Sequence, residues 1–338
     1  MADRLLHSIT LYGFGDRYVH GSDTLEDILQ RAKDCNGDGF EIVAPQMVEG
    51  HPNPSEDWKK YFIDAYHKYD LVPVCYSIYI DSGKHKGRFL TEEERLTETI
   101  NEMEVAKELG FKIVRSQDAL LPTTMEKLLP YAEALDLQLA IEMHGPYCPT
   151  SPIFMEYEEL FNRANSEHLG VVMDFSAFTS GAPATVLNRF PDDVCNKPLI
   201  HKIRRLYETT ETPEEDLIAQ LYAEGGDEVD ELIIRKEIFS IPKDSKFGAI
   251  YWRTQPDYEG FRRLLKWSKY MHGKFMYVDD DLVSEGTDFP TFVKIMKEEN
   301  YQGFIASEYE GNRFLPGESD DVQIKKHIRM LDKLWAES

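Results

Sequence analysis

Positive charge and long apolar runs are both scarce in this chain of 338 residues. Its 38 Lys and Arg residues face 61 Asp and Glu residues, which gives a formal net charge of -23. A surface this acidic argues against partners such as nucleic acid or an anionic membrane. No apolar run approaches the roughly 20 residues that cross a bilayer, so no membrane span is expected.

Cysteine is scarce as well. The four cysteines form no CxxC pair, which indicates unpaired thiols in a reducing compartment. The N-terminus has no basic stretch followed by an apolar core, so we expect no secretory signal peptide and a cytoplasmic protein. Glycine-rich phosphate loops and the GxSxG elbow are absent too, so neither a nucleotide loop nor a serine hydrolase is indicated.

What the chain does contain is a regular alternation of short apolar strands with amphipathic helices. Strands are expected at 6–12, 39–44, 71–79, 111–116, 137–144, 169–175, 270–278 and 301–309. Helix starts are expected at Asp23 or Ser22, and at Thr91, where Glu94 completes a capping box. Eight strand–helix units predict a parallel sheet closed into an α/β (β/α)8 TIM barrel, with residues 1–338 as one domain.

The alternation stops between residues 180 and 262. This segment is acidic and its pattern is mostly helical; Thr212-Pro213-Glu214-Glu215 is typical of a helix start. We therefore expect a helical insertion after the sixth strand, which would cover the site or bind a partner.

Candidate site residues stand at the end of the fifth expected strand. Leu139 and Ile141 fall on one face, whereas Glu142 and His144 fall on the other, because successive strand side chains point to opposite sides. In a β/α barrel, inward polar residues at the C-terminal ends of strands form the active site.

The next three strands each offer one further inward residue of this kind. They are Asp174, His272 and Glu308, with Lys274 two residues beyond the histidine. Three carboxylates and a neutral imidazole carry a charge of about -3, which is costly to bury unless a cation offsets it. Oxygen ligands with one imidazole suit Mn²⁺, Mg²⁺, Fe²⁺ or Co²⁺ better than structural Zn²⁺, and Mn²⁺ is the first choice.

Each of these residues also has an ordinary structural interpretation when taken singly. Glu142 could be a hydrogen-bonded buried group, His272 a core histidine, and Asp174 the cap of the following turn. The joint pattern favours a metal site. His144 lies further along its strand than Glu142, where a substrate would lie, so we favour a general acid/base; a fifth ligand or a supporting group are the alternatives.

Weaker candidates stand near other strand ends. Gln46, Gln117 and Lys274 could hydrogen-bond a polyhydroxylated ligand, and each could equally be structural.

The order of the four ligands resembles the xylose-isomerase-like sugar phosphate isomerase/epimerase superfamily over nearly the whole chain. Within it, five stretches resemble the large α subunit of the C-glycoside deglycosidases: EIVAPQMVEG (41–50), IEMHGPY (141–147), VVMDFSAF (171–178), MHGKFMY (271–277) and SEYEG (307–311). The resemblance implies a divalent metal, usually Mn²⁺, held by Glu142, Asp174, His272 and Glu308, with His144 as the catalytic acid/base. It also implies a small β subunit in a hetero-oligomer.

The resemblance implies cleavage of the carbon–carbon bond between sugar and aglycone in 3-oxo-C-glycosides, through an enediolate. The metal pattern equally suits an isomerase or epimerase of sugars or keto sugars, which pass through the same kind of intermediate. A barrel that only binds sugars is a third possibility, although a carboxylate-rich metal site with a histidine exceeds what binding requires.

Overall fold

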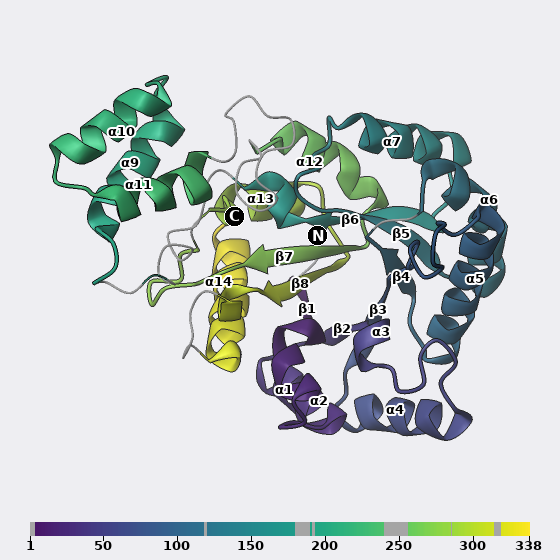
Figure 1. The fold of residues 1–338 in the computed structure, drawn as a ribbon. Coiled ribbons are helices and arrows are strands. Elements are labelled where there is room, and N and C mark those ends of the chain that lie inside the picture. Colours follow the sequence, from purple (N-terminus) through teal and green to yellow (C-terminus); the bar gives the residue numbers. More distant parts are fainter. Residues whose placement is uncertain are drawn as a thin grey trace.

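The eight expected strands pair in sequence order and close on themselves, each parallel to its neighbours, in the computed structural model of this protein (Figure 1). The structure describes residues 4–117, 120–179, 190, 193–239, 256–284, 286–313 and 319–338. The strands are β1 (Leu6–Thr10), β2 (Gly39–Val43), β3 (Val72–Ile78), β4 (Ile113–Ser116), β5 (Gln138–Met143), β6 (Leu169–Asp174), β7 (Tyr270–Phe275) and β8 (Phe304–Tyr309). The predicted (β/α)8 barrel is confirmed.

Between and after the strands the chain forms helices, most of which surround the barrel and cover the outward faces of its strands (Figure 1). They are α1 (Gly15–Val19), α2 (Leu25–Asp34), α3 (Ala44–Met47), α4 (Glu56–Lys68), α5 (Glu92–Glu108), α6 (Pro122–Leu135), α7 (Pro152–Ala164), α9 (Lys197–Thr209), α10 (Glu214–Ala223), α11 (Glu228–Ile234), α12 (Tyr258–Leu264), α13 (Phe289–Glu298) and α14 (Asp320–Glu337). None of these described helices is both long enough and apolar enough to cross a membrane.

Local details correct several of the predicted boundaries. Strand β7 ends at Phe275 rather than residue 278, and β8 begins at Phe304 rather than residue 301. The first strand ends at Thr10 rather than residue 12, because Leu11–Phe14 turns as a 3-10 helix. Helix α2 is capped by Thr24, and the prediction of Asp23 or Ser22 was wrong. The Thr24 hydroxyl accepts from the backbone N–H of Asp27, and the Asp27 carboxylate accepts from the backbone N–H of Thr24. Asp23 instead forms an ion pair with Arg31. The capping box of Thr91 with Glu94 is confirmed.

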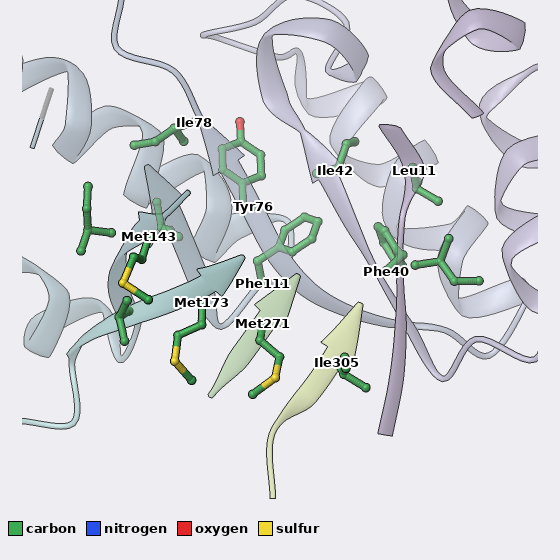
Figure 2. Packing of buried hydrophobic residues seen from close by; sticks show 14 of the residues in the cluster. Leu11, Phe40, Ile42, Tyr76, Ile78, Phe111, Met143, Met173, Met271 and Ile305 are labelled. Atoms are coloured by element: carbon green, nitrogen blue, oxygen red, sulfur yellow. The ribbon is translucent and has the colours of Figure 1, made fainter. Parts of the chain in front are cut away.

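Side chains along each strand divide between two apolar clusters. Outward residues such as Met143, Met173 and Met271 pack in the large core between strands and helices (Figure 2). A smaller cluster fills the barrel interior and includes Ala140, Val172, Tyr270 and Ala306. Each of these four stands two residues before a predicted metal ligand on the same strand. The interior cluster therefore closes the barrel on the N-terminal side of the polar residues.

Helices α9, α10 and α11 lie between β6 and β7 in the chain, to one side of the barrel (Figure 1). They share an apolar cluster of their own, with Ile200, Leu217, Leu221 and Ile234 among its buried members. The described part of the expected insertion, residues 190, 193–239 and 256–262, is mostly helical and contains no strand. That residues 1–338 form one domain, with 180–262 as an insertion in it, stays a prediction.

Candidate active site

Strand pairing brings the predicted site residues level with one another. Asp174 on β6 pairs with His272 on β7, and Lys274 on β7 pairs with Glu308 on β8. Paired residues of adjacent parallel strands share a face of the sheet, so all four side chains enter the barrel interior. They are all buried there, together with Glu142 from β5.

Three of the predicted ligands form a compact cluster. Possible ligand atoms of Glu142, Asp174 and His272 all lie within 4.8 Å of one another. The Nδ1 atom of His272 is 2.6 Å from Oε1 of Glu142. Glu308 is outside this cluster, although its Oε2 atom is 3.5 Å from the same Nδ1. Its role as a fourth ligand therefore stays a prediction. Asp174 also accepts from the Ser176 amide, so it caps the following turn as well.

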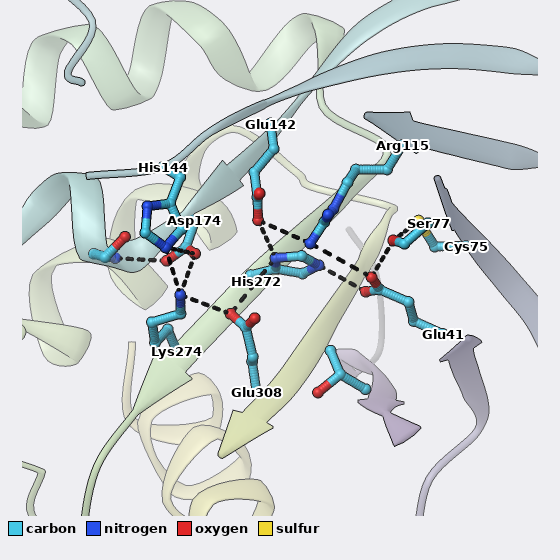
Figure 3. A network of polar contacts seen from close by, with 12 residues as sticks. Glu41, Cys75, Ser77, Arg115, Glu142, His144, Asp174, His272, Lys274 and Glu308 are labelled. Atoms are coloured by element: carbon cyan, nitrogen blue, oxygen red, sulfur yellow. Dashed lines mark hydrogen bonds and ion pairs between the residues drawn. The ribbon is translucent and has the colours of Figure 1, made fainter. Parts of the chain in front are cut away.

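The imidazole of His272 lies between two carboxylates (Figure 3). Its Nε2 atom is 2.6 Å from Oε2 of Glu41, on the side away from Glu142. Burial disfavours the imidazolium, but Glu41, Glu308 and Glu142 together raise the pKa of His272 well above its ordinary value. His272 is therefore an integral part of an ionic network rather than an isolated core histidine.

Glu41 and Arg115 are site residues that the sequence prediction missed. Burial works against the charged form of Glu41, but His272 and Arg115 hold its pKa down at about 2. Arg115 donates through Nη2 to Oε1 of Glu142 at 3.3 Å. The alternation of side chains along this strand already indicated that Glu41 points inward, because it stands between the outward residues Phe40 and Ile42. The prediction was confined to the later strands.

His144 and Lys274 meet on the other side of the cluster. The Nζ atom of Lys274 lies 2.9 Å from Nε2 of His144 and 2.8 Å from Oδ2 of Asp174. Burial disfavours the ammonium, but Asp174, Glu308 and Glu310 raise the pKa of Lys274 well above its usual value. A charged lysine is thus held beside the imidazole that was predicted as acid/base.

A cavity of about 270 Å³ opens over this network at the C-terminal ends of the strands. Glu142 and His144 line it, and so do all three predicted ligand-binding residues, Gln46, Gln117 and Lys274. Its remaining lining residues are Thr10, Tyr12, Glu41, Val43, Tyr79, Arg115, Glu308 and Glu310. Most of the lining is polar, which suits a polyhydroxylated ligand.

A larger cavity of about 900 Å³ lies at the opposite end of the barrel and contains none of these residues. Several of its charged groups are paired locally, for example Lys112 with Asp136 and Lys269 with Glu167. The N-terminal end of a β/α barrel is ordinarily concerned with stability, so we assign the site to the smaller cavity.

The polar cluster carries more negative than positive charge. Five buried acidic side chains lie close to three buried basic ones. The acidic residues are Glu41, Glu142, Asp174, Glu308 and Glu310, and the basic residues are Arg115, His272 and Lys274. Burial and the neighbouring carboxylates Asp174 and Glu310 raise the pKa of Glu308 to about 8, against the lowering effect of Lys274 and His272.

Several oxygens of this cluster are suited to a cation. Buried atoms Oε2 of Glu142 and Oε2 of Glu308 accept no hydrogen bond within the described residues. The Oε2 atom of Glu308 lies 3.6 Å from Nζ of Lys274, and Oδ2 of Asp174 is paired with the same ammonium at 2.8 Å. Carboxylate oxygens with one imidazole nitrogen fit a divalent metal ion. The residues present can therefore hold such an ion.

Comparison with known protein sequences gives a family match and similar relatives. A family model described as xylose isomerase-like TIM barrel matches residues 29–207. The 3'-dehydrocarminate deglycosidase alpha subunit of Microbacterium sp is 26% identical, over 97% of this chain and 95% of that protein. The C-glycoside deglycosidase alpha subunit of Microbacterium trichothecenolyticum is 27% identical, over 90% of this chain and 83% of that protein.

Among solved structures, the IOLI protein with a bound zinc atom is similar to this chain. The TM-score is 0.57 and the identity 12%, over 98% of this chain and 99% of that one. At this identity the likeness concerns the fold.

Proposed function

Because the chain belongs to the xylose isomerase-like TIM barrel family, we propose that it is the catalytic subunit of a metal-dependent C-glycoside deglycosidase. The observation that carries the proposal is the similarity, over more than four fifths of each chain, to two proteins that are both named as deglycosidase alpha subunits. One of those names specifies a 3'-dehydro substrate, which agrees with a 3-oxo-C-glycoside as the substrate here.

We propose Glu142, Asp174, His272 and Glu308 as the ligands of a divalent cation, with Mn²⁺ as the first choice. Such a cation would supply the positive charge that stabilises the enediolate formed when the carbon next to a ketone loses its proton. The remaining residues of the cavity then bind and orient the sugar. Gln46, Gln117 and Lys274 line it and can hydrogen-bond the sugar hydroxyls.

The reaction that fits these residues is an elimination. A proton leaves C2 of the sugar, where the neighbouring C3 ketone makes it acidic. The electron pair forms a C1–C2 double bond, the bond from C1 to the aromatic carbon breaks, and that carbon takes up a proton. His144, whose Nε2 is 2.9 Å from Nζ of Lys274, is placed at the cavity to carry protons between these positions.

The size of the cavity supports a partner subunit. A volume of about 270 Å³ is slightly below the usual range for ligand pockets, so an aglycone of flavonoid size would extend beyond it. The part of the lining formed by the described residues is mostly polar, so a small β subunit would supply an apolar wall, with the insertion at 180–262 as the alternative source. The four cysteines, which form no CxxC pair, agree with a cytoplasmic location for such a complex.

A sugar or keto-sugar isomerase or epimerase is the second candidate, because the same residues suit enolisation of a free ketose. The test is chromatography of a 3-oxo-C-glucoside, its parent C-glucoside and simple ketoses, each with Mn²⁺ and with or without the small subunit. We expect aglycone release from the 3-oxo substrate with the partner present, and none from the parent. Epimerisation of a ketose by this chain alone, without any aglycone release, would favour the second candidate.

A further inference from the structure

We infer that Glu41 is a positioning residue, which holds His272 so that its Nδ1 atom faces the proposed cation. The inference rests on the proposed metal site and adds to it a residue outside the predicted ligand set. It is carried by the two contacts of the His272 ring, one on each nitrogen (Figure 3).

The two nitrogens of His272 face different surroundings. Nδ1 is directed at the ligand cluster, 2.6 Å from Glu142 and 3.5 Å from Glu308. Nε2 is directed across the barrel at Glu41, 2.6 Å away. A histidine that binds a metal through one nitrogen keeps a hydrogen on the other, and an acceptor for that hydrogen fixes the tautomer and the ring orientation. Glu41 is in the position of that acceptor.

Hydrogen bonds hold the Glu41 carboxylate in place, so Glu41 supports His272 and does not itself bind the cation. Its Oε1 atom accepts from the Ser77 hydroxyl on β3. Its Oε2 atom accepts from the Tyr270 hydroxyl at 2.5 Å, besides contacting His272. Arg115 approaches Oε1 at 3.8 Å. Both carboxylate oxygens are thus engaged, and Glu41 cannot turn toward a cation without breaking these bonds.

The negative charge of Glu41 has a separate effect from its shape. A carboxylate behind the imidazole makes the ligating nitrogen a better donor, and loss of such a supporting group typically lowers metal affinity 10–100-fold. Glu41→Gln keeps an acceptor oxygen for His272 but removes the charge. We therefore expect a metal affinity about 10–100-fold lower with the fold retained.

The chain offers a matched control in Glu102. This buried glutamate contacts Nε2 of His51 at 2.6 Å and accepts from the Tyr76 hydroxyl at 3.2 Å, so it shares with Glu41 an imidazole and a tyrosine hydroxyl as partners. Neither His51 nor Glu102 lines the site cavity. Glu102→Gln therefore makes the same change at a buried, histidine-contacting carboxyl group in a different place.

The experiment measures Mn²⁺ affinity by titration calorimetry for the wild-type chain, Glu41→Gln and Glu102→Gln. Zn²⁺-loaded samples, which are diamagnetic, also report the proton resonance of the His272 Nε2–H group. We expect a lower affinity and an upfield shift of this resonance in Glu41→Gln, and wild-type values in Glu102→Gln.

The outcomes separate this inference from the proposed function. A wild-type chain that binds no divalent metal contradicts the proposed metal site. A wild-type chain that binds Mn²⁺, with equal affinity in Glu41→Gln, overturns the role of Glu41 alone. If Glu41→Gln does not fold, Tyr270→Phe tests the role of Glu41 instead, because this variant removes one hydrogen bond to Glu41 and leaves His272 in place. Tyr270→Phe should lower the affinity by a smaller factor, and an unchanged affinity would overturn the inference.

Discussion

Nζ of Lys274 lies 2.9 Å from Nε2 of His144, while Nδ1 of the same ring lies 2.5 Å from the carbonyl oxygen of Gly145. A carbonyl oxygen only accepts, so Nδ1 carries the hydrogen and Nε2 presents its lone pair to the ammonium. The Gly145 carbonyl thus fixes the tautomer, and the basic nitrogen of His144 points toward the cavity.

The first prediction follows from this tautomer. His144→Ala should lower the turnover number by roughly 10²–10⁴, because a positioned proton carrier is lost, while the metal content stays the same. Turnover on the 3-oxo-C-glucoside and elemental analysis of the purified variant test this. His168→Ala is the control, since Nδ1 of His168 also contacts a carbonyl, 2.8 Å away, at the opposite end of the barrel. Loss of metal from His144→Ala would make His144 a ligand.

The second prediction concerns the ligand cluster. Glu142→Gln and Asp174→Asn should each lose the metal and the activity together, because a neutral amide no longer offsets the charge of the cation. Glu308→Gln should also lower metal content if Glu308 is the fourth ligand. Metal content after dialysis is the measurement, and Glu310→Gln, at a cavity-lining carboxylate outside the proposed ligand set, should retain the metal. Full occupancy in both Glu142→Gln and Asp174→Asn contradicts the proposed site.

The third prediction concerns Lys274 as a buried counter-charge. Lys274→Met leaves Asp174, Glu308 and Glu310 without their shared cation, and removing one partner of a buried ion pair typically costs about 3–5 kcal/mol. The free energy of unfolding in urea with a chelator present should fall by about this amount. Lys112→Met should change it far less, because water screens its exposed pair with Asp136. Equal losses in the two variants would show that Lys274 has no special electrostatic role.

The barrel was predictable from the sequence because its signal is local. Alternating apolar residues define each strand, and their even spacing with helices between them implies a parallel closed sheet. The same alternation located Glu142, Asp174, His272 and Glu308, since inward residues of neighbouring strands meet at the C-terminal ends. Strand ends were less certain, because a strand stops where its backbone turns, as at Leu11.

The contact between Glu41 and His272 could not be predicted from the spacing of residues in the sequence. Glu41 and His272 are 231 residues apart, on strands that do not pair, and their contact crosses the barrel interior. Such a contact depends on the stagger of the barrel and on the rotamers of both side chains. The pattern could have flagged Glu41 and Arg115 as inward residues, but not which atoms they meet.

The last prediction uses His327 on α14, which lies outside the site. This histidine is fully buried, its ring is stacked on Phe275 with centroids 4.1 Å apart, and Nδ1 is 2.9 Å from the Ser307 hydroxyl. Within the described residues Nε2 has no hydrogen-bond partner. Burial, with a smaller effect of His7, lowers the pKa of His327 well below its ordinary value.

Because the pKa of His327 is lower in the folded chain than in the unfolded one, the unfolded chain binds more protons at mildly acidic pH. The contribution of His327 to stability is thus present above the unfolded pKa of about 6.5 and is lost as the pH falls below it, by up to about 1.4 kcal/mol per pH unit. Urea unfolding of the wild-type chain and His327→Gln between pH 7.5 and 5, values chosen to span about 6.5, measures this. The variant should be less stable at neutral pH but should lose less stability on acidification. His20→Gln, at an exposed position, should follow the wild-type slope. Equal slopes in wild type and His327→Gln would mean that another group sets the acid sensitivity.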